Sequence, residues 1–265
     1  MDSLKTSYSK CPLCDNENIN LIKIGDCSNH PMYNPVLSPQ IKWLQCQNCD
    51  HVFTEGYFTE EGCSVVFSKT NENQKPGYDF ENQRHIWARI VKLVSQFVDH
   101  GNWLDVGFGN GSLLFTADEW GFAPVGLDLR ADSVAIMNNL GFKAFCQSLD
   151  DFNPSEKMSV ISMADVLEHT PYPKEVLRSA HRLLVDNGVL FLSMPNYNCA
   201  VWRFLDMNNA NPYWGELEHY HNFSRKRLFE LLQEVGFEPV QYGVSERYRA
   251  CMEIVARKKN TIATL

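Results

Sequence analysis

The sequence lacks a long hydrophobic run, since no stretch approaches the roughly 18 continuous apolar residues of a membrane-spanning helix. Its first five residues also lack the apolar core of a signal peptide. Basic charge is scarce as well, because the formal net charge is −8, which argues against non-specific binding to nucleic acid or anionic membranes. These absences predict a cytoplasmic protein that binds neither membrane nor, in all expectation, nucleic acid, and they leave its oligomeric state open.

A disulfide framework is lacking too. The chain has nine cysteines, an odd number, and four of them form two C-x-x-C pairs, Cys11 with Cys14 and Cys46 with Cys49. Two such pairs in one short segment suit a reducing compartment and a tetrahedral structural zinc site. The intervening residues 15–45 are rich in turn formers and poor in apolar residues, so a bound ion would supply folding energy. We predict a zinc-binding module over residues 1–67, with a Cys3His site that uses His51 as the alternative.

The rest of the chain has apolar patterns that predict a folded α/β domain. Residues 68–77 are polar and predict a linker, and apolar positions at helical spacing predict a covering helix within 80–98. An apolar strand over 103–106 then runs into a glycine turn, G-x-G-x-G over 107–111, which differs from the G-x-G-x-x-G of dinucleotide-binding proteins. The glycines let the backbone approach a ligand closely.

Strands and helices alternate after this turn, and that alternation specifies a parallel sheet with right-handed crossovers. The predicted strands cover 103–106, 124–129, 143–147, 158–163, 189–193, 238–244 and 251–256, and the predicted helices cover 111–120, 131–140, 173–184 and 225–235. Residues 197–221 have no clear period and are rich in aromatics, so 197–223 is predicted as an insertion at the acceptor site, within a domain over 101–265. Residues from 257 onward are predicted as a tail.

At this point the chain resembles class I S-adenosylmethionine-dependent methyltransferases. The matching segments are L-D-V-G-F-G-N-G-S-L-L (104–114), V-G-L-D-L (125–129), D-V-L-E-H-T (165–170), L-F-L-S-M-P-N (190–196), H-Y-H-N-F-S (219–224) and E-V-G-F (234–237). The resemblance covers roughly residues 80–257. It implies a Rossmann-like, seven-stranded α/β sheet with its last strand antiparallel, and S-adenosylmethionine as the cofactor.

The resemblance also implies roles for individual residues. The methionine part of the cofactor would lie at Asp105, Gly107 and Gly109, and the ribose at Asp128, an acid about 20 positions after the turn. Further contacts to the adenine, methionine and sulfonium would come from Leu129, Ser148, Leu149, Ala164, Asp165 and Val166. The four-cysteine module is similar to modules that precede this domain in some bacterial sugar and natural-product methyltransferases.

Three histidines are candidate bases for a hydroxyl acceptor, with His219 as the first choice and His169 and His221 as the others. An imidazole suits proton removal near neutral pH. Asp165, Glu168 and His169 form D-x-x-E-H, which resembles the E-x-x-E-H metal motif of ubiquinone-pathway O-methyltransferases and predicts a possible Mg²⁺ site. Aromatic residues of the insertion, among them Tyr213 and Trp214, are candidate walls of an acceptor pocket.

The predicted function is methyl transfer from S-adenosylmethionine to a small molecule. O-methylation of a sugar, nucleotide-linked sugar or surface-glycan precursor is the leading prediction, and an N- or C-methyltransferase of a natural-product pathway is the alternative. A rival of another class is a zinc-dependent interaction protein with a vestigial cofactor fold. The acceptor and the methylated atom do not follow from the sequence.

Overall fold

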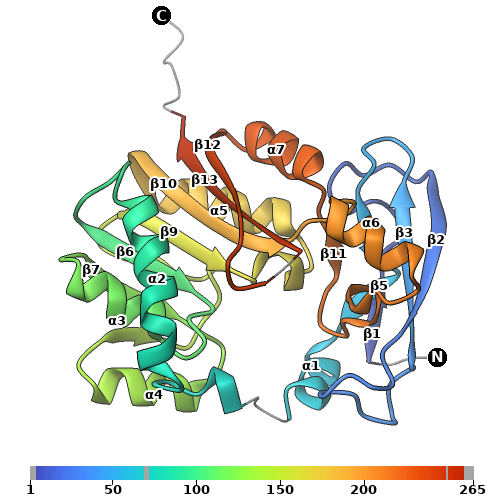
Figure 1. The fold of residues 1–265 in the computed structure, drawn as a ribbon, viewed down its shortest axis with the longest axis horizontal. Helices are drawn as coiled ribbons and strands as arrows, with labels where there is room; N and C mark the ends of the chain where they lie inside the picture. The colour runs from blue at the N-terminus through green and yellow to red at the C-terminus, as the bar shows by residue number, and fades with distance from the viewer. Residues whose placement is uncertain (1–3, 69–71, 249, 260–265) are drawn as a thin grey trace, which may run out of the picture.

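The fold was taken from a computed structural model, which describes residues 4–68, 72–248 and 250–259 (Figure 1). Seven strands form its main sheet: β6 (Asn102–Val106), β7 (Ala123–Leu127), β8 (Lys143–Phe145), β9 (Met158–Ala164), β10 (Leu184–Pro195), β12 (Phe237–Val244) and β13 (Cys251–Lys258). The helices that accompany this sheet are α2 (Phe80–Val94), α3 (Ser112–Glu119), α4 (Ala131–Asn139), α5 (Pro173–Leu183) and α7 (Arg225–Glu234).

The strand order is β12-β13-β10-β9-β6-β7-β8. Strands β6 to β10 pair in parallel, whereas β13 runs antiparallel to both β10 and β12. The predicted seven-stranded sheet with an antiparallel last strand is therefore confirmed. Its central position and parallel pairing explain why β6 is apolar on both faces, since both faces are covered.

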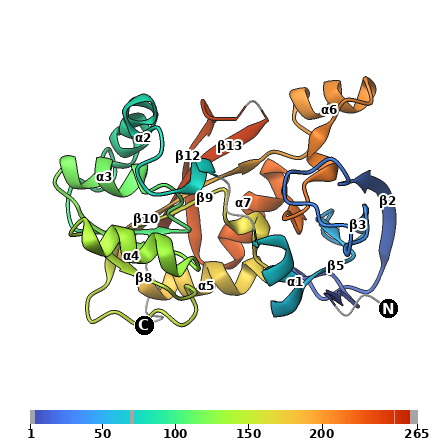
Figure 2. The same cartoon turned by 90° about the horizontal axis from the view of Figure 1, so that it is seen from below.

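Helices cover the two faces of the sheet (Figure 2). On one face, Trp103 and Val160 pack with Trp87, Ile90 and other residues of α2 and α3. On the other face, Leu104 and Ile161 pack with residues of α5 and α7. Because consecutive strand residues point to opposite faces, neighbours such as Trp103 and Leu104 enter different cores.

The N-terminal segment forms two small sheets. Strands β2 (Ile19–Asp26), β3 (Gln40–Cys46) and β4 (Val52–Thr54) pair antiparallel, and β1 (Lys5–Ser7) pairs with β5 (Gly56–Phe58). The short helices α1 (Glu60–Val66) and η1 (Glu72–Gln74) follow. A two-residue strand from far along the chain, β11 (His221–Asn222), pairs with β4 and completes a four-stranded sheet.

The insertion over 197–223 is more ordered than its sequence suggests. It contains α6 (Ala200–Met207), η3 (Pro212–Gly215) and β11, and Figure 1 shows α6 and β11 in orange beside the blue N-terminal strands. Trp202, Trp214 and Tyr220 are buried in a core shared with that segment, so these aromatics pack instead of facing a ligand. Their packing explains the apolar content that has no helical or strand period.

Several predicted boundaries need correction. The covering helix α2 ends at Val94, and β10 begins at Leu184, where the helix before it was predicted to end. The predicted tail is also wrong at its start, because Arg257 and Lys258 belong to β13 and the Lys258 ammonium donates to the Leu184 carbonyl over 2.9 Å. Residues 69–71 of the predicted linker and 260–265 of the predicted tail lie outside the described residues. Within the described part of the chain, no helix is long and apolar enough to cross a membrane.

Candidate functional site

A cavity of about 530 Å³ opens where the glycine turn, the carboxyl end of β9 and the insertion meet. The predicted cofactor residues Asp105, Gly107, Gly109, Ala164 and Asp165 line it, and so do the predicted bases His169 and His219. The other lining residues come from the segment before β6, the glycine turn, the loops after β9 and β10, the insertion and the β12–β13 hairpin: Asn73, Gln74, Gln83, Ile86, Trp87, Phe108, Asn110, Glu168, Pro195, Tyr213, Glu216, Glu218, Arg247, Tyr248 and Cys251. One cavity thus joins the predicted donor residues to the predicted bases.

The glycine turn needs its glycines for both conformation and space. Gly107, Gly109 and Gly111 have φ values of 66°, 57° and 76°, in the left-handed region that side chains disfavour. A Cβ on Gly107 would lie 2.8 Å from the Val166 side chain. Val166 therefore packs behind the turn, although it does not line the cavity itself.

Asp105 is a buried carboxyl at the carboxyl end of β6. It accepts a hydrogen bond from the Ser162 hydroxyl over 2.6 Å. Burial raises the pKa of Asp105 to about 7, while the Ser162 hydrogen bond and the charge of Arg247 act in the opposite direction. A carboxyl in this setting favours a cationic ligand, because a cation stabilises its ionised form.

The predicted ribose and adenine residues lie beside the main cavity and do not line it. Asp128 forms a two-point ion pair with Arg130 at 2.8 and 2.6 Å and accepts from the Gly109 amide over 3.3 Å. Arg130 also donates to the Gln74 carbonyl over 2.8 Å. Leu129 is 75% exposed, whereas Leu149 is 4% exposed and belongs to the hydrophobic core. Ser148 donates to Asp151 over 2.7 Å, so its hydroxyl caps the following turn.

Glu168, which is buried, and the half-buried His169 and His219 form a cluster in which one candidate ligand atom from each lies within 4.8 Å of the others. Glu168 and His169 belong to η2 (Leu167–His169) and His219 comes from the insertion, so only the tertiary fold assembles them. Among the described residues, neither carboxylate oxygen of Glu168 has a hydrogen-bond partner, and neither does Nδ1 of His219. Nδ1 of His169 lies 3.0 Å from the Glu218 carbonyl, which assigns the proton to Nδ1 and leaves Nε2 as an acceptor.

Burial sets the protonation of this cluster. It raises the pKa of Glu168 to about 8, lowers that of His169 to about 4 and lowers that of His219 well below its ordinary value. At neutral pH the cluster therefore holds a protonated carboxyl and two neutral imidazoles. Such a set can accept a proton, and it also supplies the donor atoms of a divalent metal site.

Asp165 does not join this cluster, so the predicted group of Asp165, Glu168 and His169 is not assembled. Asp165 instead forms an ion pair with Arg247 and accepts from the Ser193 hydroxyl over 3.2 Å. His219 takes its place beside Glu168 and His169. Sequence reasoning missed Arg247, because no motif surrounds it and only the fold of the β12–β13 hairpin brings it to the cavity.

His221, the third predicted base, does not line the cavity. Its Nδ1 lies 3.0 Å from Nε2 of His51, and its Nε2 lies 2.9 Å from the Thr170 carbonyl. Because a carbonyl only accepts, the proton of the neutral ring is on Nε2, and His51 donates to Nδ1. His221 thus connects the N-terminal segment to the loop that follows His169.

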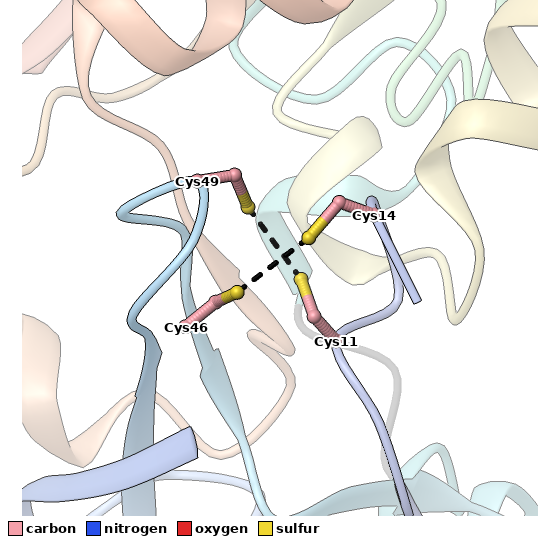
Figure 3. A group of neighbouring side chains, drawn as sticks. All are labelled: Cys11, Cys14, Cys46 and Cys49. Atoms are coloured by element: carbon pink, nitrogen blue, oxygen red, sulfur yellow. Dashed lines mark hydrogen bonds between the residues drawn. The ribbon is translucent and has the colours of Figure 1, made fainter. Parts of the chain in front are cut away.

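The four predicted zinc ligands converge on one point (Figure 3). The sulfurs of Cys11 and Cys49 lie 3.7 Å apart, those of Cys14 and Cys46 lie 3.5 Å apart, and all four lie within 4.8 Å of one another. Zn–S bonds of about 2.3 Å in a tetrahedron place sulfurs at nearly this separation, so the donor set fits zinc. His51 bonds to His221 instead, which does not support the Cys3His alternative.

Comparisons with known proteins agree with this architecture. A family described as "Methyltransferase domain" matches residues 80–242, more than half of the chain, and the protein belongs to this family. It is 30% identical over 114 residues to a ubiquinone biosynthesis O-methyltransferase of Glaesserella parasuis serovar 5 (strain SH0165), covering 38% of this chain and 48% of that protein. The chain thus spans about half the length of this curated relative.

Solved structures share the fold at low sequence identity. A 1,6-didemethyltoxoflavin-N1-methyltransferase of Burkholderia thailandensis superimposes with a TM-score of 0.55 at 16% identity, covering 82% of this chain and 99% of that one. A magnesium protoporphyrin IX methyltransferase of Synechocystis PCC 6803 gives a TM-score of 0.54 at 18% identity, covering 68% of this chain and 84% of that one. At such identities the likeness establishes the fold and not the substrate.

Proposed function

We propose that the protein is an S-adenosylmethionine-dependent methyltransferase that methylates a hydroxyl of a small molecule. The observation that carries the proposal is the single cavity that contains both the glycine turn after β6 and the Glu168–His169–His219 cluster. Methyl transfer from a sulfonium is an in-line displacement, so donor and acceptor must meet in one enclosed space. A vestigial cofactor fold has no need for such a cluster beside the turn.

The donor half of the cavity is built by the turn and by Asp105. Asp105 lies buried beside Gly107, where it can pair with the donor's ammonium group. Asp128 is the proposed ribose ligand, and a ribose diol would replace the Arg130 guanidinium, which pairs with both carboxylate oxygens in this structure. S-adenosylmethionine supplies the methyl group, while the chain aligns it and keeps water away.

The acceptor half must remove a proton from the hydroxyl. We propose His219 as the base, because it lies in the cluster with Glu168 and its Nδ1 has no hydrogen-bond partner among the described residues. The ring of His169 lies edge-on to that of His219, with centroids 4.6 Å apart, and fixes its orientation. The Glu168 carboxyl is protonated at neutral pH, and an imidazolium on His219 would favour its ionised form, because opposite charges attract strongly in a buried site.

A divalent ion is the other way in which the cluster can activate a hydroxyl. Two imidazoles and one carboxylate suit Zn²⁺, Mn²⁺ or Fe²⁺ better than Mg²⁺, which prefers oxygen ligands. The unpartnered oxygens of Glu168 fit such an ion, and the residues that would hold it are Glu168, His169 and His219. Activity of chelated protein titrated with Mg²⁺, Mn²⁺ and Zn²⁺ separates the two mechanisms: full turnover without added metal excludes the ion.

For the acceptor we propose a sugar, a nucleotide-linked sugar or a surface-glycan precursor. The acceptor half is lined by polar side chains, Glu216, Glu218 and Tyr213 among them, and these suit a molecule with several hydroxyl groups. The named activity of the ubiquinone relatives supports transfer to oxygen and makes phenols the necessary comparison. We further propose that Cys11, Cys14, Cys46 and Cys49 bind a structural zinc ion.

The proposal is tested first by donor binding. Calorimetry with S-adenosylmethionine should give tight binding to the wild type and a Kd about 10- to 100-fold higher for Asp128→Ala, the range for a lost charged hydrogen bond. Turnover is then screened with sugars, nucleotide sugars and phenols and an isotope-labelled methyl donor, whose NMR signal distinguishes O-, N- and C-methyl products. A wild-type protein that does not bind the donor contradicts the enzymatic function.

The base is tested with the first acceptor found by that screen. His219→Ala should lower kcat by about 10²- to 10⁴-fold, the usual contribution of a general base, with donor affinity unchanged. His85→Ala is the matched control, because His85 is an exposed histidine on α2. Equal kcat values for the two variants would exclude His219 as the base.

A further inference from the structure

Arg247 places a guanidinium inside the cavity from the β12–β13 hairpin, and no predicted role accounts for it. One Nη group pairs with Asp165, and the guanidinium carbon lies 4.5 Å from the centroid of the Trp87 ring. Trp87 is itself fixed by a 3.4 Å hydrogen bond from its indole nitrogen to Gln83. The Nε–H of Arg247 is buried and has no hydrogen-bond partner in the part of the chain that the structure describes. The Arg247 guanidinium is therefore held in place, and at least one of its N–H donors is not used within the protein.

The charges of the cavity wall are unequal. Among the described residues that line it, Arg247 is the only lysine or arginine, whereas five carry carboxyl groups: Asp105, Asp165, Glu168, Glu216 and Glu218. Of the other guanidinium groups near α2, Arg84 pairs with Glu119 at 2.5 Å and Arg89 pairs with Glu246, outside the cavity lining. The wall thus has more acidic than basic side chains, and Arg247 is its one permanently charged cation among the described residues.

The amino-acid end of the methyl donor carries an ammonium, a sulfonium and one carboxylate. Its two cations match the acidic wall, but the carboxylate needs a donor group. The glycine turn has few to offer, because the amides of Gly107, Gly109 and Gly111 already donate to Leu127, Asp128 and Phe108. Arg247 acts on the charge of Asp105, the residue proposed to meet the ammonium, so both groups lie at the same end of the cavity.

We propose that Arg247 binds the methionine carboxylate of the methyl donor through the free part of its donor fork. This assignment rests on the proposed function, since it requires S-adenosylmethionine in this cavity. Asp165 and the Trp87 ring hold the guanidinium in place, which reduces the side-chain entropy lost on binding. A guanidinium matches a carboxylate in geometry and forms strong charge-assisted hydrogen bonds with it.

The test compares two ligands that differ only in this group, S-adenosylmethionine and decarboxylated S-adenosylmethionine, by calorimetry. Arg247→Met should raise the Kd of S-adenosylmethionine about 10- to 100-fold and change that of the decarboxylated ligand less than about twofold. Arg247→Lys should recover part of the loss, because it keeps the charge but not the fork. Arg225→Met is the matched control, since Arg225 stacks 4.3 Å over the Tyr242 ring and does not line the cavity.

Arg247→Met also leaves the Asp165 carboxylate unpaired, and this negative charge could by itself weaken binding of the donor carboxylate. A double variant separates the two effects. If Asp165→Asn with Arg247→Met recovers wild-type affinity, Arg247 only neutralises Asp165 and the proposal is wrong. Equal losses for both ligands in Arg247→Met would also overturn it, because they would indicate a general disturbance of the site. A wild-type protein that binds neither ligand refutes the proposed function, and the assignment of Arg247 falls with it.

Discussion

The buried position of Asp105 raises the pKa of its carboxyl and so makes its charge depend on pH and on a bound cation. It is 4% exposed, and burial raises its pKa to about 7. Without ligand it is protonated below about pH 7 and ionised above, so an ammonium group gains a full ionic partner only at higher pH. The same shift makes folding less favourable as pH rises from the ordinary aspartate value towards 7, since the folded state holds the proton more tightly.

This gives a pH dependence that can be measured. The Kd of S-adenosylmethionine should fall as pH rises from about 6 to about 8, by at most tenfold per unit below the pKa, and then level off. Asp105→Asn should bind more weakly at about pH 8 and lose this slope. Calorimetry at three pH values provides the test, and an unchanged slope in the variant would assign the titration to another group.

At this scale the sequence predicts residues that are close in the chain and misses those that only the fold brings together. Asp105, Gly107 and Gly109 could be predicted because they share one continuous turn with positive φ at both glycines. Glu168 and His169 could be predicted as neighbours, but their pairing with His219 depends on an insertion without periodicity. Arg247 could not be found, since a single arginine in a hairpin carries no local signal.

At the scale of elements, the insertion is held against β2 by backbone contact. A Cβ on Gly25 would lie 1.8 Å from the Trp214 carbonyl oxygen, and one on Gly215 would lie 2.5 Å from the Asp26 carbonyl oxygen. The same Trp214 oxygen accepts from the Trp43 indole over 2.9 Å. The backbone of the insertion that supplies His219 therefore packs directly against the backbone of β2, and a side chain at either glycine would clash.

Gly25→Ala tests this fit. It should lower the free energy of unfolding by about 3 kcal/mol, because the added methyl group meets backbone that cannot move away cheaply. Gly243→Ala is the control, since a Cβ at Gly243 in β12 would meet no atom within 4 Å, and this change should cost about 0.5 kcal/mol or less. Denaturant unfolding measures both, and similar losses would show that the contact does not constrain the insertion.

At the scale of the whole molecule, the main sheet can be predicted from the sequence, whereas the packing of the N-terminal segment against the insertion cannot. The parallel pairing of β6 to β10 follows from strand–helix alternation and right-handed crossovers, rules that need only local patterns. The N-terminal sheet does not follow from such rules, because its last strand, β11, has two residues and lies next to β4 only in space. Figure 1 shows the result, with the first and last thirds of the chain in contact at one end of the molecule.

This arrangement predicts that zinc stabilises the acceptor half of the cavity and has little effect on the donor half. Cys46 and Cys49 flank β4 and His51, and His51 bonds to His221, whereas the glycine turn belongs to the main sheet. Removing the metal or introducing Cys46→Ser should therefore increase hydrogen exchange in residues 197–223 and change that of residues 103–119 little. Donor affinity should change less than about threefold, and a larger change would connect the zinc site to the donor half.

The pairing of β11 with β4 also has a consequence for biosynthesis. His51 meets His221, a residue 170 positions later, so the N-terminal sheet cannot be completed until His221 has left the ribosome. Until then the nascent chain carries β4 as an open edge with apolar Val52 and Phe53 on it, a surface prone to wrong pairing. Chaperones that bind extended apolar strands should therefore act on this chain during translation, until β11 pairs with β4.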